Sequence, residues 1–331
     1  MKKLINDPES VVSEMVAGFV AAYPKKVKQV PGTNVVVRAD APVQGKVGIV
    51  SGGGSGHEPA HGGYVGKGML DGAVAGEVFT SPTPDQVFEA IKAVDGGKGV
   101  LLVIKNYTGD VMNFEMAAEL AEVEGIKVEK VIVNDDAAVE NSTYTVGKRG
   151  IAGTVLVHKI AGALAETGAT LEEVAAVANK VVANLSTMGM ALSPSTIPAA
   201  GKPGFTIDEN EMEIGTGIHG EPGIERSEIK TADEVADILL NKVVNQLHLE
   251  KNNEVAVMIN GLGATPLMEL YIVNNRVSSV LKEMDISVRE TFIGEYMTSL
   301  EMAGCSITLL RLDQQLSELL DAQADTIAFK K

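Results

Sequence analysis

The fold of this chain is constrained most by a set of short runs of valine and isoleucine. Each run is followed by a glycine-rich or polar turn and then by a helical pattern. The clearest runs cover residues 47–50 before SGGGSG, 100–104 before KNYTGD, and 131–133 before NDD. Continuous apolar runs of this length are typical of strands buried on both faces, and alternating strands and helices indicate a parallel sheet. The sequence therefore predicts an α/β protein.

The helices between these strands carry recognisable start signals. Thr83 and Pro84 precede apolar residues at helical spacing, and proline is favoured in the first turn of a helix. Thr170 and Glu173 have the spacing of a capping box, in which each residue satisfies a free backbone N–H near the other. Both segments are therefore predicted to begin helices.

The middle of the chain indicates a division into two domains. Two helical patterns, over 151–166 and 171–185, follow each other without a strand between them. Residues 186–204 are rich in Ser, Thr, Gly and Pro and lack a clean period, which predicts a linker or crossover. With 331 residues and about 150 residues per domain, we expect one α/β domain over 1–187 and a second over 188–331.

The second half continues the alternation of strands and helices. It is expected to close a second α/β lobe, with mostly parallel or mixed sheets overall and a substrate site between the lobes. The expected elements are a strand over 211–220 that ends in a glycine loop, helices over 232–247, 267–284 and 313–320, and strands over 255–259, 288–293 and 306–310.

Charge and cysteine content exclude several classes of function. The formal net charge is −16, so the protein repels nucleic acid and anionic lipid, and neither is expected as a partner. Cys305 is the only cysteine, which rules out an internal disulfide and favours a reducing compartment. No run of about 18 apolar residues occurs. We expect a cytoplasmic protein without a membrane segment.

The segment SGGGSGHEP, residues 51–59, is the first candidate for chemistry. Its glycines follow a buried strand, where ligands bind in open α/β sheets, and they let backbone N–H groups approach a ligand closely. No Lys-Ser/Thr follows as in a phosphate-binding loop, and no acidic partner of a dinucleotide site is present. A tight structural turn is the alternative. His57 adds a candidate general base or hydroxyl ligand.

Two further strand ends carry polar side chains. Lys105 and Asp110 lie in IKNYTGD, where lysine can bind a hydroxyl or anion and the carboxylate can accept a proton. Ser81 follows another expected strand. A turn with a solvated lysine is the alternative for IKNYTGD taken alone. Because strand ends of one sheet meet at the same edge, these residues and His57 are expected to converge on one crevice.

The second lobe contributes His219 in GTGIHGEPG. A neutral imidazole is a nucleophile as well as a base, and the flanking glycines leave room for a small carbonyl compound. His61 is expected near the first glycine loop, while His158 and His248 are interpreted as structural. The histidines and the single cysteine have no metal-binding spacing, so no metal is predicted.

Taken together, SGGGSGHEP, FTSPTPDQ, IKNYTGD and GIHGEPG resemble the substrate-binding subunit of dihydroxyacetone kinase, and the likeness covers nearly the whole chain. The resemblance implies that dihydroxyacetone forms a covalent hemiaminal with His219. It also implies that His57 and Asp110 orient and deprotonate the hydroxyl that receives phosphate. The substrate-binding residues that it implies are Gly54, Ser55, Gly56, His57, Ser81, Lys105 and Asp110.

The resemblance also implies partners. Neither a phosphate-binding loop nor an acidic magnesium cluster occurs in the sequence, so no cofactor is expected on this chain. A separate nucleotide-binding subunit carrying ADP and magnesium is expected instead, rephosphorylated from phosphoenolpyruvate in the phosphotransferase-system form. A homodimer and a role in glycerol metabolism are further implications.

Two alternatives stay open. One is a coactivator that binds dihydroxyacetone and activates a transcription regulator without turnover. Retention of His57, Lys105, Asp110 and His219 together favours the enzyme, because a sensor has no need for the base. The other is a nucleotide-binding protein that uses SGGGSG, and the missing lysine and acidic partners count against it.

Overall fold

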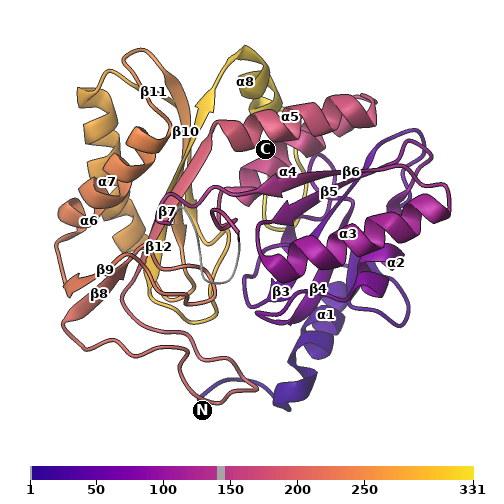
Figure 1. Ribbon diagram of the computed structural model, residues 1–331, viewed down its shortest axis with the longest axis horizontal. Coiled ribbons are helices and arrows are strands. Elements are labelled where there is room, and N and C mark those ends of the chain that lie inside the picture. Colours follow the sequence, from indigo (N-terminus) through magenta and orange to yellow (C-terminus); the bar gives the residue numbers. More distant parts are fainter. Residues whose placement is uncertain (1, 140–145) are drawn as a thin grey trace.

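Two six-stranded sheets with helices on their faces form the protein (Figure 1). The structure is a computed structural model, and it describes residues 2–139 and 146–331. Each sheet belongs to one half of the sequence, with the change between β6 and β7. The predicted α/β class with two lobes and mixed sheets is confirmed.

The first sheet has a parallel centre with two antiparallel strands at one edge. Strands β3, β4, β5 and β6 pair in parallel, whereas β1 and β2 are antiparallel to their neighbours. The order across the sheet is β1 (Val27–Gln29), β2 (Val35–Arg38), β4 (Gly72–Val78), β3 (Gly48–Ser55), β5 (Val100–Lys105) and β6 (Val128–Val133).

The second sheet is mostly antiparallel. Only β10 and β11 pair in parallel, and β12 enters between β10 and β7 although it is the last strand in the sequence. The order is β11 (Ser287–Gly294), β10 (Glu254–Gly261), β12 (Gly304–Leu312), β7 (Leu185–Ala191), β8 (Glu211–Ile214) and β9 (Glu225–Glu228).

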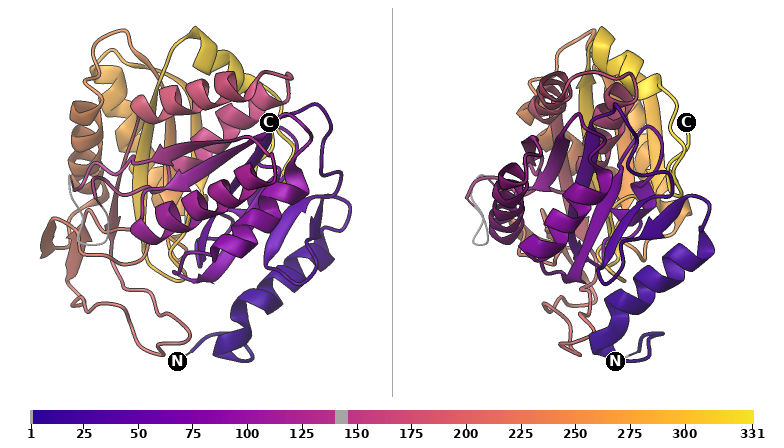
Figure 2. Two further views of the ribbon diagram at one scale, coloured as in Figure 1. Left: turned by 45° about the vertical axis from the view of Figure 1, so that its right-hand side comes forward. Right: turned by 90° about the vertical axis from the view of Figure 1, so that its right-hand side faces the viewer.

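Helices separate and cover the two sheets. One apolar core joins α4 and α5 to strands of both sheets, while α2 and α3 cover the outer face of the first sheet, and α6 and α7 that of the second. Figure 2 shows α1, in indigo, next to the N-terminus on the outside of the first lobe. The helices are α1 (Val11–Ala22), α2 (Pro84–Val94), α3 (Thr108–Val123), α4 (Thr154–Ala165), α5 (Leu171–Ala183), α6 (Ala232–Gln246), α7 (Leu267–Glu283) and α8 (Gln314–Asp321), with short 3-10 turns at Pro8–Ser10 and Gly62–Tyr64.

Strand β5 illustrates why continuous apolar runs predicted these strands. Leu101 and Val103 pack into the core shared with α4 and α5, and Leu102 and Ile104 pack into the core under α2 and α3. Successive side chains of a strand point to opposite faces, so a strand between two helical layers needs apolar residues at every position. The capping box that opens α5 is also present. Within the described residues, no helix is long and apolar enough to cross a membrane.

The expected loop after residue 50 is wrong in its boundary, because β3 continues through the glycines to Ser55. A Cβ on Gly52 would lie 2.5 Å from the carbonyl oxygen of Val74, and one on Gly54 would lie 2.5 Å from the backbone nitrogen of Thr80. Glycine is therefore required at both positions, because β4 and the segment that follows it lie too close to β3 for a side chain. Glycine usually weakens a strand, which is why the sequence suggested a loop.

The predicted linker over 186–204 is also wrong at its start. Residues Leu185–Ala191 form β7, a fully buried strand between β12 and β8. Its sequence, LSTMGMA, has few branched residues and therefore lacks the usual strand signal. The predicted domain boundary at residue 187 falls inside this strand, and the division into two domains stays a prediction.

Candidate active site

A cavity of about 520 Å³ lies between the two lobes at the ends of β3 and β5. The first lobe contributes Gly54, Ser81 and Asp110, and the second contributes His219 and Phe205. This position is the carboxyl end of the parallel strands, where open α/β sheets bind ligands. The convergence expected from the strand ends is therefore present, and His57 and Lys105 lie fully buried next to the cavity.

His57 is held in one tautomer. Its Nδ1 lies 2.8 Å from the backbone oxygen of Thr298, and because a carbonyl can only accept, Nδ1 carries the proton. The Nε2 atom is buried without a described partner. Burial, with His219 and Lys105 nearby, lowers the pKa of His57 well below its usual value. His57 is therefore neutral and presents a free lone pair, as a general base requires.

The partner of His57 comes from the second lobe and is itself firmly placed. The side chain of Asn260 accepts hydrogen bonds from the backbone N–H groups of Tyr296 and Met297, and it donates to the Met297 oxygen. The backbone N–H of Thr298 donates back to the oxygen of His57. A buried amide on β10 thus fixes the segment that orients His57. Asn260 is therefore a positioning residue for His57.

His219 forms the second fixed histidine. Its Nδ1 lies 2.8 Å from Oε1 of Glu221, whose Oε2 accepts the His219 backbone N–H at 2.9 Å. Burial alone would raise the pKa of Glu221, but His219 and Arg149 lower it to about 2. The ionised carboxylate accepts the Nδ1 proton, which leaves the Nε2 lone pair free to attack a carbonyl carbon.

Aromatic rings surround His219. The centroid of its ring lies 4.6 Å from that of Tyr107, 5.2 Å from that of Phe79 and 4.8 Å from that of His57, each in an edge-to-face arrangement. His57 in turn stacks on Phe79 at 5.1 Å. His219 thus lines the cavity in an apolar frame that includes the buried His57, and this frame limits the water that can compete with a carbonyl substrate.

Arg149 connects Glu221 to the rest of the structure. Its Nε donates to Asp136 at 2.6 Å, and its Nη2 donates to the oxygen of Gly215 at 2.8 Å. Gly217 has no room for a side chain, because a Cβ there would lie 2.1 Å from a carboxylate oxygen of Glu221. The absence of a side chain at Gly217 therefore leaves room for the buried Glu221 carboxylate beside His219.

Asp110, Ser81 and Lys105 form the polar group on the opposite side of the cavity. Ser81 Oγ donates to Asp110 Oδ1 at 2.5 Å, and Lys105 Nζ lies 3.4 Å from Asp110 Oδ2. Lys105 is the last residue of β5, Asp110 lies in the first turn of α3, and Ser81 lies between β4 and α2. The hydroxyl group of a substrate bound here would lie near the Asp110 carboxylate, the Lys105 ammonium group and the Ser81 hydroxyl.

The glycine-loop residues lie in different places. Gly54 lines the active-site cavity, and Gly56 adopts a φ of +102°, where a Cβ would lie 2.8 Å from the ring of Phe79. Ser55 donates its hydroxyl to the oxygen of Gly76 and lines a second cavity, on the side of β3 that faces α1.

His61 and His158 form a separate buried pair. Nδ1 of His61 lies 3.0 Å from Nε2 of His158, and burial lowers the pKa of both, to about 3 for His158. Two neutral rings share one proton in this contact. His158 is thus part of the packing of α4 against the first sheet, whereas His248 lies just beyond the end of α6.

Four important residues were not singled out from the sequence. Glu221 lies two residues after His219 in the quoted motif, so a search for a carboxylate beside the nucleophile could have found it. Arg149, Thr298 and Asn260 are far from the motifs in sequence, and nothing local indicates their roles. Within residues 2–139 and 146–331, no group of three or more His, Cys, Asp or Glu side chains could hold a metal ion.

The model of the Dak1 domain matches residues 17–328. The chain belongs to the Dak1 family. Among curated Dak1 relatives, it is 55% identical to "PTS-dependent dihydroxyacetone kinase 1, dihydroxyacetone-binding subunit DhaK" of Listeria innocua, covering 99% of this chain and 100% of the relative. It is 46% identical to "PEP-dependent dihydroxyacetone kinase, dihydroxyacetone-binding subunit DhaK" of Escherichia coli, covering 99% of each chain.

Solved Dak1-type structures of two kinds are similar to it. The dihydroxyacetone kinase of C. freundii, in complex with AMP-PNP and Mg²⁺, superimposes with a TM-score of 0.90 at 36% identity, covering 99% of this chain and 61% of the other. The "Dihydroxyacetone kinase operon co-activator Dha-DhaQ" gives a TM-score of 0.88 at 37% identity, covering 96% and 97%. Both an enzyme and a coactivator therefore share this fold.

Proposed function

We propose that this chain is the dihydroxyacetone-binding subunit of a phosphotransferase-system-dependent dihydroxyacetone kinase. The observation that carries the proposal is a pair of oriented imidazoles in ring contact. His219, held by ionised Glu221, lines the cavity, and His57, held by the Thr298 carbonyl, is buried next to it with its ring centroid 4.8 Å from that of His219. The names of the curated relatives support the substrate and the phosphoryl-transfer reaction.

The first step is covalent capture of the ketone. Nε2 of His219 forms a bond to the carbonyl carbon, and the π electrons of the carbonyl move to its oxygen. The Nδ1 proton, passed on through Glu221, ends on that oxygen and gives a neutral hemiaminal. Only a ketone or aldehyde can react in this way, so glycerol is excluded by reactivity rather than by size. Tethering also fixes the position of the terminal hydroxyl.

The second step is transfer of a phosphoryl group to the tethered substrate. Asp110 and the neutral His57 orient the terminal hydroxyl, and its proton leaves to Asp110 as its oxygen forms a bond to phosphorus. The bond between phosphorus and the donor breaks at the same time, and its electron pair stays with the donor on the partner subunit. Lys105 and Ser81 hold the Asp110 carboxylate. Phosphoryl transfer depends mainly on positioning and electrostatics, and this chain contributes the acceptor side of the reaction.

The phosphoryl donor belongs to a separate nucleotide-binding subunit that carries ADP and magnesium. Helix α3 supports a docking surface beside the cavity, because Thr108 and Gly109 at its start line the cavity. Farther along, Met112, Met116, Leu120 and Val123 form an exposed apolar stripe at helical spacing. Surfaces of this kind are typical of protein interfaces.

Further parts of the proposal concern assembly and cellular setting. We infer a homodimer, supported by exposed Leu267, Met268, Tyr271 and Ile272 on α7. Cys305 is buried and unpaired, which fits a reducing cytoplasm, and glycerol metabolism is the expected setting.

The proposal is tested by intact mass spectrometry and by a reconstituted transfer assay. The protein incubated with dihydroxyacetone should gain the full mass of one ligand molecule, and His219→Ala should lose the adduct. With the nucleotide-binding subunit and a phosphoryl donor, the wild-type chain should form dihydroxyacetone phosphate. Binding without an adduct would disprove the covalent step.

A dihydroxyacetone-binding coactivator is the second candidate, favoured by the structural match to the coactivator from the dihydroxyacetone kinase operon. An adduct that forms normally, without any phosphoryl transfer in the presence of the nucleotide-binding subunit, would support this candidate. Retained Asp110 and His57 favour the kinase, because a sensor requires capture of the ligand but no base.

A further inference from the structure

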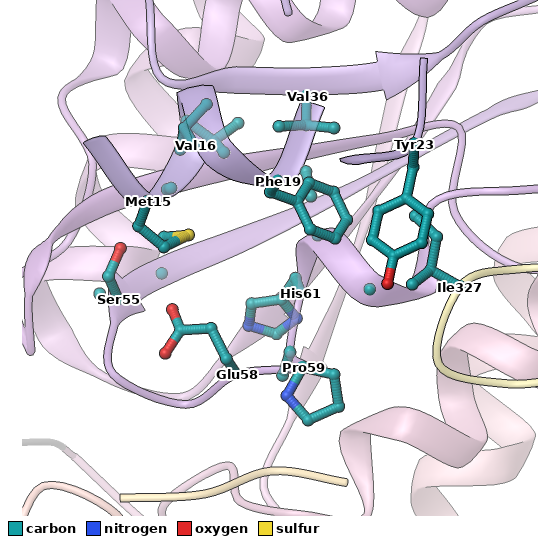
Figure 3. Close-up of a pocket in the computed structure, with 18 residues that line it drawn as sticks. Met15, Val16, Phe19, Tyr23, Val36, Ser55, Glu58, Pro59, His61 and Ile327 are labelled. Carbon is teal, nitrogen blue, oxygen red and sulfur yellow. The ribbon is translucent and has the colours of Figure 1, made fainter. Parts of the chain in front are cut away.

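A second cavity, of about 410 Å³, lies between α1 and the first sheet (Figure 3). We call it the α1 cavity. Phe19 of α1 and Tyr23, directly after the helix, form one wall, and Ala73 and Ala75 of β4 form the opposite wall. Among the described residues, Gly54 is the only one that lines both this cavity and the active-site cavity. The two are therefore separate spaces on either side of the β3 terminus.

The α1 cavity exists because small residues face large ones across it. Gly53, Ala73 and Ala75 leave the sheet surface flat beneath α1, and Phe19 and Tyr23 bridge the gap. Protein interiors are normally close-packed, and larger side chains at the alanines would fill the gap. An apolar space in the size range of about 300 to 1,000 Å³ is typical of small-molecule sites. Much smaller apolar cavities already bind apolar molecules.

Glu58 is the charged group of the cavity. Both of its carboxylate oxygens accept the backbone N–H of Gly56 at 3.1 Å, and the side chain keeps exposed surface because it faces the hollow. Burial by the surrounding atoms raises its pKa. His61 is neutral and is engaged with His158. No lysine or arginine is among the described residues that line the cavity.

These groups decide which head group a ligand can carry. A carboxylate with unused lone pairs accepts hydrogen bonds from a hydroxyl or an ammonium group. An anionic head group would lie beside a like charge without a cation to balance it. In the view of Figure 3, Glu58 and Ser55 lie at one end of the cavity, and Tyr23 and Ile327 lie at the other. The cavity thus has a carboxylate and a hydroxyl group at one end, and a phenol ring and an aliphatic side chain at the other.

We propose that the α1 cavity binds a small aliphatic molecule whose polar end, an alcohol or an amine, donates a hydrogen bond to Glu58. The apolar chain lies between the aromatic side chains of Phe19 and Tyr23 and the alanines of β4. The proposal concerns a cavity other than the one that His219 lines, and its test requires neither the adduct nor phosphoryl transfer. It therefore stands or fails independently of the proposed function.

The first experiment measures binding of matched probes to the full chain by isothermal titration calorimetry. Hexan-1-ol and hexan-1-amine should bind, whereas hexanoate should bind at least tenfold more weakly. In the alcohol series from butan-1-ol to hexan-1-ol, affinity should rise about fourfold for each added methylene group. Equal binding of hexanoate, or no binding of any probe, would overturn the proposal.

Two variants place the binding in the α1 cavity. Ala75→Leu should fill the space and weaken hexan-1-ol at least tenfold, and Ala93→Leu, the same change at a half-buried residue of α2, should leave its affinity unchanged. Glu58→Gln should weaken the amine more than the alcohol and reduce the discrimination against hexanoate. Wild-type affinity in Ala75→Leu would show binding elsewhere and overturn the assignment.

Folding of the variants is checked by thermal unfolding, and the probe series on the wild-type chain tests the proposal without any substitution. A crystal of the protein soaked in hexan-1-amine should show the nitrogen within hydrogen-bond distance of Glu58. A second copy of the chain seated over the cavity, with no probe density, would assign the space to an interface instead and overturn the proposal.

Discussion

Replacement of Glu221 by glutamine should disable His219 while leaving the cavity intact. In the wild type, the carboxylate accepts the Nδ1 proton at 2.8 Å and keeps the Nε2 lone pair free. A glutamine amide can donate to Nδ1 instead, which moves the ring proton to Nε2 and removes the nucleophile. Hydrogen bonds to a charged group contribute about 1.5 to 3 kcal/mol. Affinity for dihydroxyacetone should therefore fall about 10- to 150-fold.

The same substitution has a second, independent readout in stability. Burial opposes the charge on Glu221, but His219 and Arg149 lower its pKa from 4.5 to about 2. At about 1.4 kcal/mol for each pKa unit, this corresponds to about 3 kcal/mol. Because the folded pKa is lowered, this stabilisation is complete above pH 4.5 and is lost as the pH falls toward 2. Glu221→Gln should lower the free energy of unfolding at pH 7, and the difference from wild type should shrink in acid.

The assays are intact mass spectrometry over a dihydroxyacetone titration and urea unfolding between pH 7 and pH 2.5. Glu225→Gln is the matched control, because Glu225 is exposed on β9 in the same lobe. The control should keep wild-type affinity and stability. An adduct of wild-type affinity in Glu221→Gln would refute the role assigned to the carboxylate, and a constant stability difference across the pH range would refute the electrostatic argument.

Four further predictions concern turnover, docking and packing. Asp110→Asn should retain the adduct and lose about 100- to 10,000-fold in turnover with the partner subunit; near-normal turnover would show that another group is the base. The purified chain alone should not phosphorylate dihydroxyacetone with ATP, and ³¹P NMR would reveal product if it did. Met112→Lys with Met116→Lys should weaken binding of the nucleotide-binding subunit at least tenfold in a pull-down titration and spare the adduct, with Ile229→Lys, at another exposed apolar residue, as control. Gly52→Ala should lower the free energy of unfolding by about 1 to 3 kcal/mol, because its Cβ would lie 2.5 Å from a β4 carbonyl, and unchanged urea unfolding would contradict this.

The sequence predicted the parallel strands because their residues face helices on both sides. Leu101 to Ile104 are apolar at every position, as is typical of a strand between two helical layers. The end of β3 was predicted too early because glycine usually indicates a loop. In β3 the glycines are present because β4 and Thr80 approach the strand too closely for a side chain. The strand β7 was missed because its burial comes from β12, which lies more than 100 residues away.

The candidate site was predictable where chemistry follows a strand. His57, Lys105 and Asp110 stand at strand ends, so the parallel sheet brings them together. Thr298 could not be inferred in this way, because its backbone carbonyl acts without regard to its side chain. Asn260 acts through its side-chain amide, but the segment that it holds lies 36 to 37 residues later in the sequence. The tautomer of His57 depends on the Thr298 carbonyl, and only the packing of the two lobes places it there.

The hydrogen bond between His57 and the Thr298 carbonyl makes the chemistry of the first lobe depend on the second. His57 belongs to the first lobe, yet the acceptor that sets its proton is the Thr298 carbonyl, and the N–H of Leu300 also donates to Gly56. A chain divided after the first sheet would keep its histidine, its glycines and its aspartate, and the imidazole would be free to rotate and exchange its proton with water. If the two halves were made as separate chains, they would have to associate and restore these contacts before His57 and His219 could act together.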